Sequence, residues 1–372
     1  MNFSYWEKSS LITSNHFTII GSGIVGLFAA IEIVNKFPAK KVVVIERNFL
    51  PEGASTKNAG FACFGSVSEL TDDLQNMSLN QIMTLVELRF KGLEKLIKTL
   101  GKERIEYKNS GNWELFSAES YKDFEDKIEF WNQHLKDITG ENTFQLKNGK
   151  NFAFHGFDKY VFNQYEGAIN TGLMMQNLMQ LAREKGITIF NGLEITRFEE
   201  NQNEVSLYQN DNLILKTENL IICNNGFARQ FLPQFDVKPA RNNVFVTSKI
   251  QGLSFDTCFH LDKGYTYFRN VDSNRVLIGG ARNLDIENEE TTEIGINPKI
   301  KTHLIEILKD KIIPNQNFTI DYEWSGVLGV GKEKFPIIKK LSPRVYCAVR
   351  MGGMGVAIGS MVGQKAAEII EE

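Results

Sequence analysis

Two glycine-rich stretches carry the clearest chemical signal in this sequence. The first, Gly21-Ser-Gly23-Ile-Val-Gly26, has the spacing GxGxxG, and the second, RMGGMGVAIGS, occupies Arg350–Ser360. In the first stretch, the first glycine permits a tight turn, the second lets the backbone approach a pyrophosphate, and the third allows close helix–strand packing. Glu46 stands 20 residues beyond Gly26, a separation typical of the acid that binds a ribose diol. Together these residues predict a bound dinucleotide.

The residues around this motif form the elements that it requires. The apolar segment Phe17–Ile20 is predicted to be a strand, the residues after the turn form a helix to about Lys36, and KKVVVIE forms a second strand that ends at Glu46. In such a strand–helix–strand unit the phosphates lie at the helix N-terminus, where free N–H groups and the helix dipole favour negative charge. The motif therefore has the context that dinucleotide binding needs.

The loop after Glu46 discriminates between the two common dinucleotide cofactors. It reads RNFLPEGASTKNAGFACFGS and is long and rich in small residues. A nicotinamide enzyme normally continues directly into the next βα unit, whereas a flavin needs cover along its ribityl chain and ring. The AGFACFG portion is also too apolar for a flexible surface loop. This loop favours FAD over NAD.

The composition is that of a soluble enzyme and excludes several other classes. The chain has 372 residues, of which 42% are hydrophobic, and a net charge of −3. Because there is no basic excess, no nucleic-acid partner is expected. The four cysteines lack metal-ligand spacing, so we expect reduced, mostly buried thiols and no metal site: Cys63, Cys223, Cys258 and Cys347.

No segment of the sequence suggests export or a membrane span. The N-terminus MNFSYWEKSS lacks the apolar core of a signal peptide. The apolar run Phe17–Ile31 is too short to cross a bilayer and is interrupted by three glycines. We therefore expect a cytoplasmic protein.

The rest of the sequence alternates helical and strand patterns. A helical period runs from LNQIMTLVELRF to Gly101, and a charged, aromatic helix is expected at Glu119–Leu135. VDSN, between two strand-like runs, is a hairpin signal. The C-terminal segment reads as a strand, the second glycine turn and a helix. This alternation indicates an α/β (or α+β) protein with two interleaved domains.

Eight pieces that span most of the chain resemble the glycine and D-amino-acid oxidase family of flavoproteins, which includes sarcosine oxidase. They are TIIGSGIVGLFAAIEI, VVVIER, GASTKNAGF, NLIICNNGFARQFLP, GYTYFRN, RVLIGGAR, EWSGV and GGMGVAIGS. The resemblance implies a Rossmann-like FAD-binding domain, interleaved with an antiparallel β-sheet substrate domain that covers the flavin. The FAD-binding domain would comprise residues 1–78, 158–230 and 325–372, and the substrate domain residues 79–157 and 231–324.

The resemblance also implies which residues hold FAD, without a covalent bond. The dinucleotide portion and the path toward the ring would contact Gly21, Gly23, Gly26, Glu46, Arg47, Ser55, Thr56, Lys57, Asn58, Phe198 and Gly226. The second glycine stretch would bring a helix N-terminus to the ring edge that becomes negative on reduction, through Gly352, Gly353, Met354, Gly355 and Val356.

Several positions depart from the family pattern. Leu328 stands where glycine-oxidase-like members carry an Arg that holds the substrate carboxylate, and Leu is no substitute for a bidentate Arg. Leu277 replaces a flavin-facing Lys, and GVLGVGKEKFP lacks the Cys that attaches flavin covalently in sarcosine-type enzymes. Arg350-Met351 replaces the usual Gly-His pair, so substrate preference is expected to depend on these two residues.

The remaining candidates line one strand and its ends. Tyr265, Tyr267 and Arg269 alternate along one strand face, as pocket-lining residues do, although aromatic residues at period two are also typical of a sheet core. The substrate candidates are Tyr265, Arg269, Arg282 and Leu328, and the catalytic candidates are Arg350, Met351 and Tyr267. Arg350 is either a carboxylate anchor or the partner of a buried acid. No catalytic role is expected for His134, His155, His260 or His303.

Three functions remain open. The first is oxidation of a C–N bond of a small-molecule amine or amino acid to an imine, by hydride transfer to flavin N5, with reoxidation by oxygen or another acceptor. The second is a 2-hydroxy-acid dehydrogenase of the same fold, and the third is a flavin-binding subunit without turnover of its own. The substrate, the electron acceptor and the oligomeric state also stay open.

Overall fold

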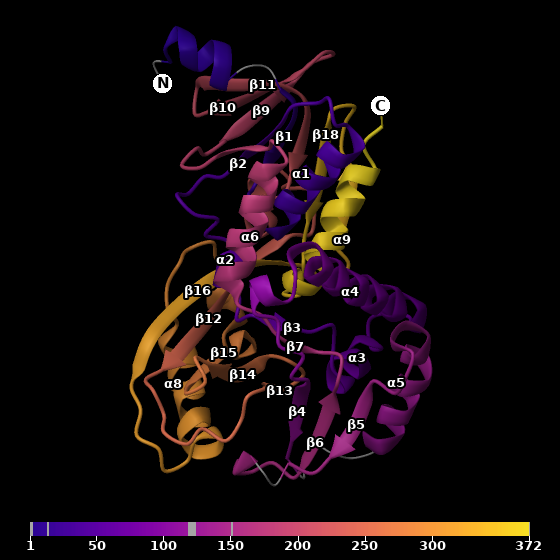
Figure 1. Cartoon of the computed structure of the whole chain (residues 1–372), viewed down its shortest axis with the longest axis vertical. Coiled ribbons are helices and arrows are strands. Elements are labelled where there is room, and N and C mark those ends of the chain that lie inside the picture. The colour runs from indigo at the N-terminus through magenta and orange to yellow at the C-terminus, as the bar shows by residue number, and fades with distance from the viewer. Residues whose placement is uncertain (1–2, 13–14, 118–123, 150–151, 372) are drawn as a thin grey trace.

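The computed structural model describes residues 3–12, 15–117, 124–149 and 152–371. Two lobes lie one above the other in Figure 1, each built on an eight-stranded sheet. The chain passes between the lobes several times, so neither lobe is a continuous stretch of sequence. This confirms an α/β fold with a Rossmann-like cofactor domain and a second, sheet-based domain.

The first sheet contains the predicted strand–helix–strand unit. Its strands follow the order β17 (Ile337–Lys340), β18 (Val345–Val349), β11 (Asn212–Ile222), β1 (Asn15–Ile20), β2 (Val42–Ile45) and β8 (Thr188–Phe190). The neighbours from β18 to β8 are parallel, whereas β17 pairs antiparallel with β18. Two further strands, β9 (Arg197–Glu200) and β10 (Val205–Gln209), extend β11 as an antiparallel meander.

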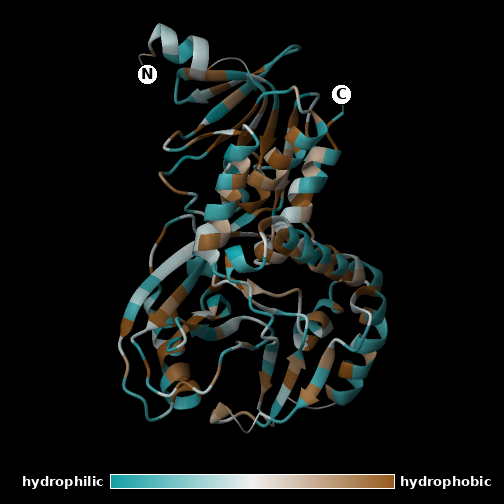
Figure 2. Cartoon of the chain, viewed as in Figure 1, coloured by the Kyte–Doolittle hydropathy of each residue, from teal (hydrophilic) through white to brown (hydrophobic). Residues whose placement is uncertain are grey.

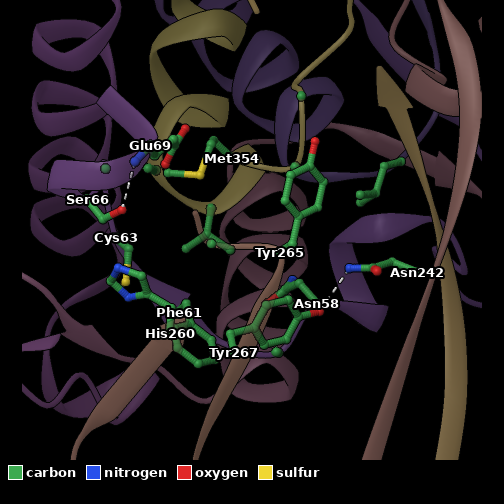
Figure 3. A pocket seen from close by; sticks show the side chains of 18 of the residues that line it. Asn58, Phe61, Cys63, Ser66, Glu69, Asn242, His260, Tyr265, Tyr267 and Met354 are labelled. Atoms are coloured by element: carbon green, nitrogen blue, oxygen red, sulfur yellow. Dashed lines mark hydrogen bonds between the residues drawn. The ribbon is translucent and has the colours of Figure 1, made fainter. Parts of the chain in front are cut away.

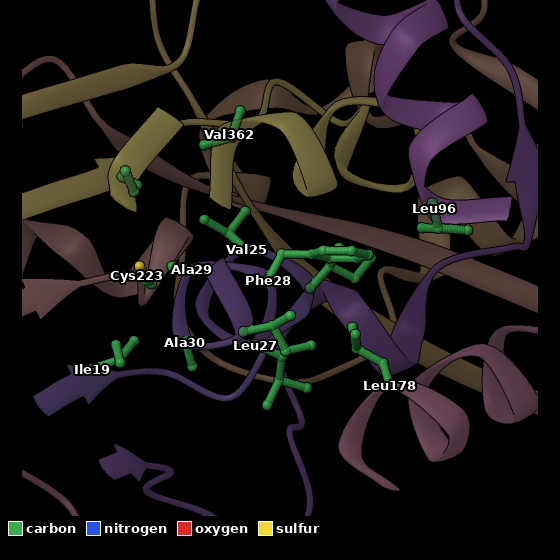
Figure 4. Packing of buried hydrophobic residues seen from close by; sticks show 14 of the residues in the cluster. Ile19, Val25, Leu27, Phe28, Ala29, Ala30, Leu96, Leu178, Cys223 and Val362 are labelled. Atoms are coloured by element: carbon green, nitrogen blue, oxygen red, sulfur yellow. The ribbon is translucent and has the colours of Figure 1, made fainter. Parts of the chain in front are cut away.

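Four helices pack beside this sheet, and their apolar faces meet in one hydrophobic core. They are α1 (Ile24–Lys36), α4 (Leu79–Leu100), α6 (Thr171–Glu184) and α9 (Gly355–Glu368). Helix α9 packs against both α1 and α4. Figure 4 shows Val25 and Phe28 of α1 among Leu96, Leu178 and Val362 from the other three helices. This core fixes the N-termini of α1 and α9, the two helices that begin at the glycine-rich stretches.

The second sheet is mostly antiparallel, as expected. Its strands follow the order β16 (Ile320–Val330), β12 (Lys238–Thr247), β15 (Arg275–Gly280), β14 (Thr266–Val271), β13 (Cys258–Leu261), β4 (Asn112–Phe116), β6 (Lys159–Asn163) and β5 (Phe144–Lys147). The pair of β4 and β13 is parallel, which the prediction of an antiparallel sheet did not include. The turn at VDSN joins β14 to β15 as predicted, with Asp272 and Ser273 both at positive φ.

The other helices cover the second sheet or join the lobes. They are α2 (Ala54–Lys57), α3 (Val67–Asp73), α5 (Phe124–Thr139), α7 (Ile286–Glu289) and α8 (Pro298–Ile307). The predicted helix at Glu119–Leu135 lies partly outside the described residues, and α5 begins at Phe124. Figure 2 shows hydrophilic and hydrophobic colours together on α4 and α5, as expected for helices with one buried face.

The segment after β2 connects the lobes. It runs through α2 to β3 (Phe61–Ala62), which pairs with β7 (Gly167–Ala168), and then enters α3. The predicted domain boundaries fall close to strands of the second sheet, since residue 158 immediately precedes β6 and residue 325 lies within β16. The division into domains at these residues stays a prediction.

All four cysteines are free thiols, as predicted. Three of them are buried, and Cys63 is half-buried. No helix within the described ranges is long and apolar enough to cross a membrane.

Candidate active site

A first cavity lies at the ends of the parallel strands β1, β2 and β11. Its lining includes six of the predicted cofactor residues: Gly21, Gly23, Glu46, Arg47, Ser55 and Gly226. Open parallel sheets bind ligands at the carboxyl ends of their strands. The three segments that the sequence could only place separately therefore meet at one cavity.

The first glycine loop has the shape that pyrophosphate binding needs. Gly21 has a φ of +104°, and a Cβ at this position would come within 2.8 Å of the Cys223 carbonyl oxygen. At Gly26 a Cβ would lie 1.9 Å from the Gly21 carbonyl oxygen, so this glycine lets α1 pack against the turn rather than lining the cavity. Gly23 caps α1 without a side chain, and Ser55 Oγ accepts a hydrogen bond from Ile24 N at 3.0 Å.

The polar residues of this cavity fit a dinucleotide. Glu46 is buried and accepts hydrogen bonds from Ser22 N at 3.2 Å and Ser22 Oγ at 3.0 Å, which orient its carboxylate. Asn224 Oδ1 is buried without a hydrogen-bond partner in the described structure. The Arg47 guanidinium stacks 3.6 Å above the Phe227 ring. A glycine cradle, an oriented acid and an unsatisfied acceptor are the features that a ribose and a diphosphate would engage.

A second cavity continues from the first toward the other lobe. Ala54 lines both cavities, so they adjoin at the start of α2. The second cavity is lined by ten predicted site residues: Lys57, Asn58, Tyr265, Tyr267, Arg282, Leu328, Gly352, Gly353, Met354 and Val356. Figure 3 shows Met354, Tyr265 and Tyr267 on the lining of this cavity.

The second glycine stretch brings a helix N-terminus to this cavity. Gly352 and Gly353 have φ values of +59° and +87°, and α9 begins two residues later at Gly355. Met354 caps α9 without a side-chain hydrogen bond. Free N–H groups at such an end stabilise negative charge. Gly355 does not itself line the cavity, and we propose that the turn before it and the first turn of α9 face the flavin.

Arg350 does not line the cavity, which corrects its assignment to the catalytic site. Its guanidinium donates to the carbonyl oxygens of Phe335 at 2.9 Å and Asp236 at 3.1 Å. It also donates to Glu333 Oε2 at 3.2 Å. The side chain is 6% exposed, and no donor is directed at the cavity. The acids that Arg350 contacts are not the buried acid that the sequence allowed for, because the Asp236 and Glu333 side chains are 37% and 78% exposed.

Two other candidates are also structural. Arg269 donates from Nε to the Ala59 carbonyl oxygen at 2.8 Å and from Nη2 to the Ile169 carbonyl oxygen at 3.1 Å, so it holds the β3–β7 region and does not line the cavity. Met351 is buried in the core around α1. Both predictions of substrate or catalytic contact are therefore corrected, because each side chain points into packed protein.

Two predicted cofactor contacts lie outside both cavities. The Thr56 hydroxyl donates to the Pro51 carbonyl oxygen at 2.7 Å and stabilises the loop before α2. The Phe198 ring packs against Phe231, with 6.0 Å between the ring centroids. Phe231 lines the first cavity, so Phe198 supports that wall from behind. Both residues act through their neighbours.

Tyr267 lines the cavity, and its hydroxyl oxygen accepts a hydrogen bond from Asn242 Nδ2 at 3.0 Å, which leaves its own O–H proton to donate. Burial raises the pKa of Tyr267. Tyr265 is 36% exposed, and its hydroxyl has no hydrogen bond in the described structure. The Tyr265 hydroxyl can therefore both donate to and accept from a ligand.

The sequence did not reveal a buried polar network on one side of the cavity. Asn112 donates to Glu166 Oε2 at 2.8 Å, and His260 Nδ1 lies 3.1 Å from Asn112 Oδ1. His260 Nε2 lies 3.8 Å from Glu114 Oε1. Glu166, Asn112 and His260 line the cavity. The parallel pairing of β4 with β13 brings Asn112 and His260 together, and no local pattern in either strand signals this pairing.

Burial governs the charge of this network. It raises the pKa of Glu166 to about 7, although hydrogen bonds from Asn112 and from the Phe64 and Gly65 N–H groups oppose the rise. Burial likewise raises the pKa of Glu114 to about 7, against hydrogen bonds from Ser68 and Ser66. Burial lowers the pKa of His260 to about 4, so its imidazole is neutral at pH 7.

Ion pairs between the lobes form another part of the lining. Lys334 Nζ lies 2.6 Å from Asp73 Oδ1 and 3.1 Å from Glu69 Oε1. Burial alone would raise the pKa of Glu69, but Lys334 and Arg89 lower it to about 2. Lys263 pairs with Asp72 at 2.6 Å. Burial raises the pKa of Asp73, although Lys334 opposes the rise. Each of these carboxylates lies beside a cation.

The fold and both cavities are those of an FAD-dependent oxidoreductase. Residues 16–369 match the family described as "DAO: FAD dependent oxidoreductase", and the chain belongs to this family. The resemblance stated from the sequence is thus confirmed, and FAD is the cofactor.

Individual relatives have low sequence identity to this chain but match it over almost its whole length. "Probable oxidoreductase OrdL" of Haemophilus influenzae is 22% identical, over 95% of this chain and 82% of its own. Glycine oxidase from Bacillus cereus has 15% identity and a TM-score of 0.75, covering 96% of this chain and 94% of its own. L-proline dehydrogenase from P. horikoshii has 18% identity and a TM-score of 0.76, with the same coverage. Iminodiacetate oxidase from Chelativorans sp. has 16% identity and a TM-score of 0.75, with 95% coverage of each chain.

Proposed function

We propose that this protein oxidises a C–N bond of a small amine or amino acid to an imine. The observation that carries the proposal is the second cavity, which adjoins the dinucleotide cavity at Ala54 and has the N-terminus of α9 on one side. Bound FAD would supply the two-electron acceptor, which takes a hydride from the substrate carbon. The chain's own contribution is to exclude water, orient the substrate and stabilise negative charge through α9.

The side chains around the cavity favour C–N over C–O oxidation. A hydroxy acid must lose its O–H proton as the hydride leaves, which requires a base close to the substrate. His260 is the histidine on the cavity, but its Nε2 is buried away from the surface and lies near Glu114. Both Glu166 oxygens already accept hydrogen bonds. An amine needs less assistance, since its nitrogen lone pair stabilises the electron-deficient carbon.

The relatives give independent support for this class of substrate. Glycine oxidase and iminodiacetate oxidase, by their names, act on compounds that carry nitrogen next to a carboxylated carbon. A flavin-binding subunit without turnover remains the competing function, because Leu328 lines the cavity in place of an anchoring Arg.

Anaerobic reduction of the flavin tests the proposal. The purified, FAD-loaded protein is mixed with primary amines, N-methyl amino acids, D-amino acids and 2-hydroxy acids, and the flavin absorbance is followed. We expect bleaching by one of the nitrogen compounds and none by the hydroxy acids. Bleaching by hydroxy acids alone would show the dehydrogenase function. A flavin that no compound bleaches would favour the subunit without turnover.

A further inference from the structure

We propose that Arg282, with the hydroxyl of Tyr265, binds the carboxylate of an amino-acid substrate. This inference rests on the proposed function and narrows its substrate class from amines and amino acids to amino acids. It also provides a carboxylate-binding group in place of the Arg that is missing from β16, where the Leu328 side chain has no hydrogen-bond donor. The anchor would instead come from the residues that follow β15.

The distribution of charge singles out Arg282. Four Lys or Arg side chains of the described structure line the second cavity: Lys57, Lys263, Arg282 and Lys334. Lys263 is neutralised by Asp72, and Lys334 by Asp73 and Glu69. Within the described ranges Arg282 has no acid partner, and its guanidinium contacts only the Tyr265 ring, although an arginine has five N–H donors to satisfy. An anionic ligand group would satisfy them with a bidentate, charge-assisted pair.

Lys57 is the other cation of this cavity without an acid partner in the described residues. It belongs to α2, where its carbonyl oxygen accepts a hydrogen bond from Trp324 Nε1 at 2.9 Å. The start of α2 is also the place where the dinucleotide cavity adjoins, so Lys57 lies on the cofactor side. Arg282 approaches the cavity from the sheet of the other lobe. A substrate bound between cofactor and sheet would therefore meet Arg282.

The backbone holds Arg282 beside Tyr265. Gly280 has a φ of +101°, and a Cβ there would lie 1.9 Å from the Tyr265 carbonyl oxygen. Ala281 follows in the left-handed region at φ +57°, and its N–H donates to the same oxygen at 2.6 Å. Arg282 then begins the short 3-10 helix η6 (Arg282–Leu284). Only glycine fits at residue 280 without strain, so Gly280 fixes the turn that places Arg282 next to Tyr265.

The two side chains are neighbours on the wall of the second cavity. The Arg282 guanidinium lies over the Tyr265 ring, 5.7 Å from its centroid, so this contact leaves its N–H donors without an acceptor. The neighbouring Asn283 is also fixed, because its Nδ2 donates to Asp262 Oδ2 at 2.9 Å across the β13–β14 turn. Figure 3 shows Tyr265 and Met354 on the lining of one cavity, which Arg282 also lines.

Binding of a compound that cannot be oxidised tests this carboxylate clamp of Arg282 and Tyr265 separately from turnover. Pyrrole-2-carboxylate carries nitrogen next to a carboxylated carbon but has no hydride to give, and pyrrole-2-carboxamide is its neutral counterpart. Affinities are measured from the perturbation of the flavin spectrum of the FAD-loaded protein. We expect Arg282→Gln to weaken binding of the carboxylate about 10- to 100-fold, as for a lost charge-assisted pair, and to change binding of the carboxamide less than about threefold.

Three further variants sharpen the test. Arg282→Lys should recover part of the affinity, and Tyr265→Phe should lose about three- to tenfold, as for one hydrogen bond. Lys263→Gln, which removes a cation of the same cavity that is already paired, should change the affinity less than about threefold. Equal binding of the carboxylate by the wild type and Arg282→Gln would overturn the inference. So would a loss in Lys263→Gln or Lys57→Gln as large as in Arg282→Gln.

The clamp and the proposed function can fail independently. If Arg282 governs binding of pyrrole-2-carboxylate but no amine bleaches the flavin, the clamp stands and the proposed function does not. If amines bleach the flavin equally well with or without a carboxylate, and Arg282→Gln leaves this reduction unchanged, the proposed function stands and the clamp is wrong.

Discussion

At the scale of single residues, the partners of a charge decide its role. Arg350 and Arg282 look alike in the sequence, since each follows a strand and stands beside glycines. In the structure, Arg350 is buried between Glu333, Asp236 and the Phe335 carbonyl oxygen, whereas Arg282 faces the cavity without an acid. The first therefore stabilises the fold, and the second is available to a ligand.

The variant Arg350→Met tests the structural role. We expect the free energy of unfolding to fall by about 1–3 kcal/mol, because two carbonyl oxygens and a carboxylate lose a charged donor. Urea unfolding of the holoenzyme measures this loss. Arg183→Met, at an exposed position of α6, serves as the matched control and should change stability by less than about 0.5 kcal/mol. Weaker binding of pyrrole-2-carboxylate without any loss of stability would return Arg350 to the substrate site.

The buried Glu166 should make stability depend on pH. Its pKa is about 7 in the folded protein, against an ordinary value of 4.5. Between pH 4.5 and 7, Glu166 is therefore mostly protonated in the folded state and mostly ionised in the unfolded state. Unfolding free energy should therefore fall as pH rises from about 4.5 to 7, by roughly 3 kcal/mol at most, and then stay low. Glu166→Gln has no such proton and should reduce this slope.

Unfolding of the holoenzyme at several pH values between 4.5 and 8 measures the slope. Glu184→Gln, at the exposed end of α6, is the comparison and should keep the slope of the wild type. Glu114 titrates in the same range, so part of the slope should persist in Glu166→Gln. An identical slope in Glu166→Gln and the wild type would contradict the prediction.

At the scale of elements, close helix packing positions the cavity. Helix α9 contacts both α1 and α4, and its first turn lines the second cavity. At Gly92 of α4 a Cβ would come within 2.2 Å of the Ala357 carbonyl oxygen in that turn. The contact between these helices therefore fixes the N-terminus that we propose faces the flavin.

Gly92→Ala should disturb this contact. We expect a loss of about 1–3 kcal/mol in unfolding free energy, as for overpacking in a core, together with weaker FAD binding. Gly172→Ala offers a control within α6, where the nearest atom to a Cβ is Asn170 Oδ1 at 3.4 Å, and it should be neutral or slightly stabilising. Thermal unfolding and fluorescence titration with FAD measure both quantities. Normal FAD affinity in a destabilised Gly92→Ala would show that α9 does not position the cofactor.

At the scale of the whole molecule, FAD would link segments that are distant in the sequence. The two adjoining cavities draw their linings from β1, β2, the α2 region, β11, β16 and α9. A ligand that binds only the folded state stabilises it by mass action. The cofactor should therefore contribute to the stability of the whole chain as well as to its chemistry.

The apoprotein should unfold at a lower temperature than the FAD-loaded protein. Linkage predicts about 2.7 kcal/mol of stabilisation when free FAD is 100 times its dissociation constant. We also expect acid precipitation to release the flavin, because no covalent bond is predicted, although Cys63 lines the second cavity. Differential scanning calorimetry and absorbance of the supernatant test these points. A flavin that stays with the precipitated protein would show covalent attachment, for which Cys63→Ser is the first variant to examine.

The sequence by itself determined the cofactor loop, the strand–helix–strand unit that holds it and the family. The loop and its unit depend on local properties contained within Phe17–Glu46: glycine spacing, hydrophobic period and the acid at the end of β2. The family resemblance depends on short motifs spread over most of the chain, and each of them is also local in sequence. The second glycine turn and its helix were equally local, and both formed where they were predicted.

Only the tertiary structure decided which polar residues are partnered. Arg350 and Arg269 were site candidates in the sequence, but the fold gives both of them other acceptors. One Arg350 acceptor, the Asp236 carbonyl oxygen, and both Arg269 acceptors come from segments 100 or more residues away. His260 showed no partner in the sequence, yet the pairing of β13 with β4 places it beside Asn112. Hydrogen bonds and ion pairs act over a few ångströms, so the role of a charged side chain depends on which distant segments the fold brings within that range.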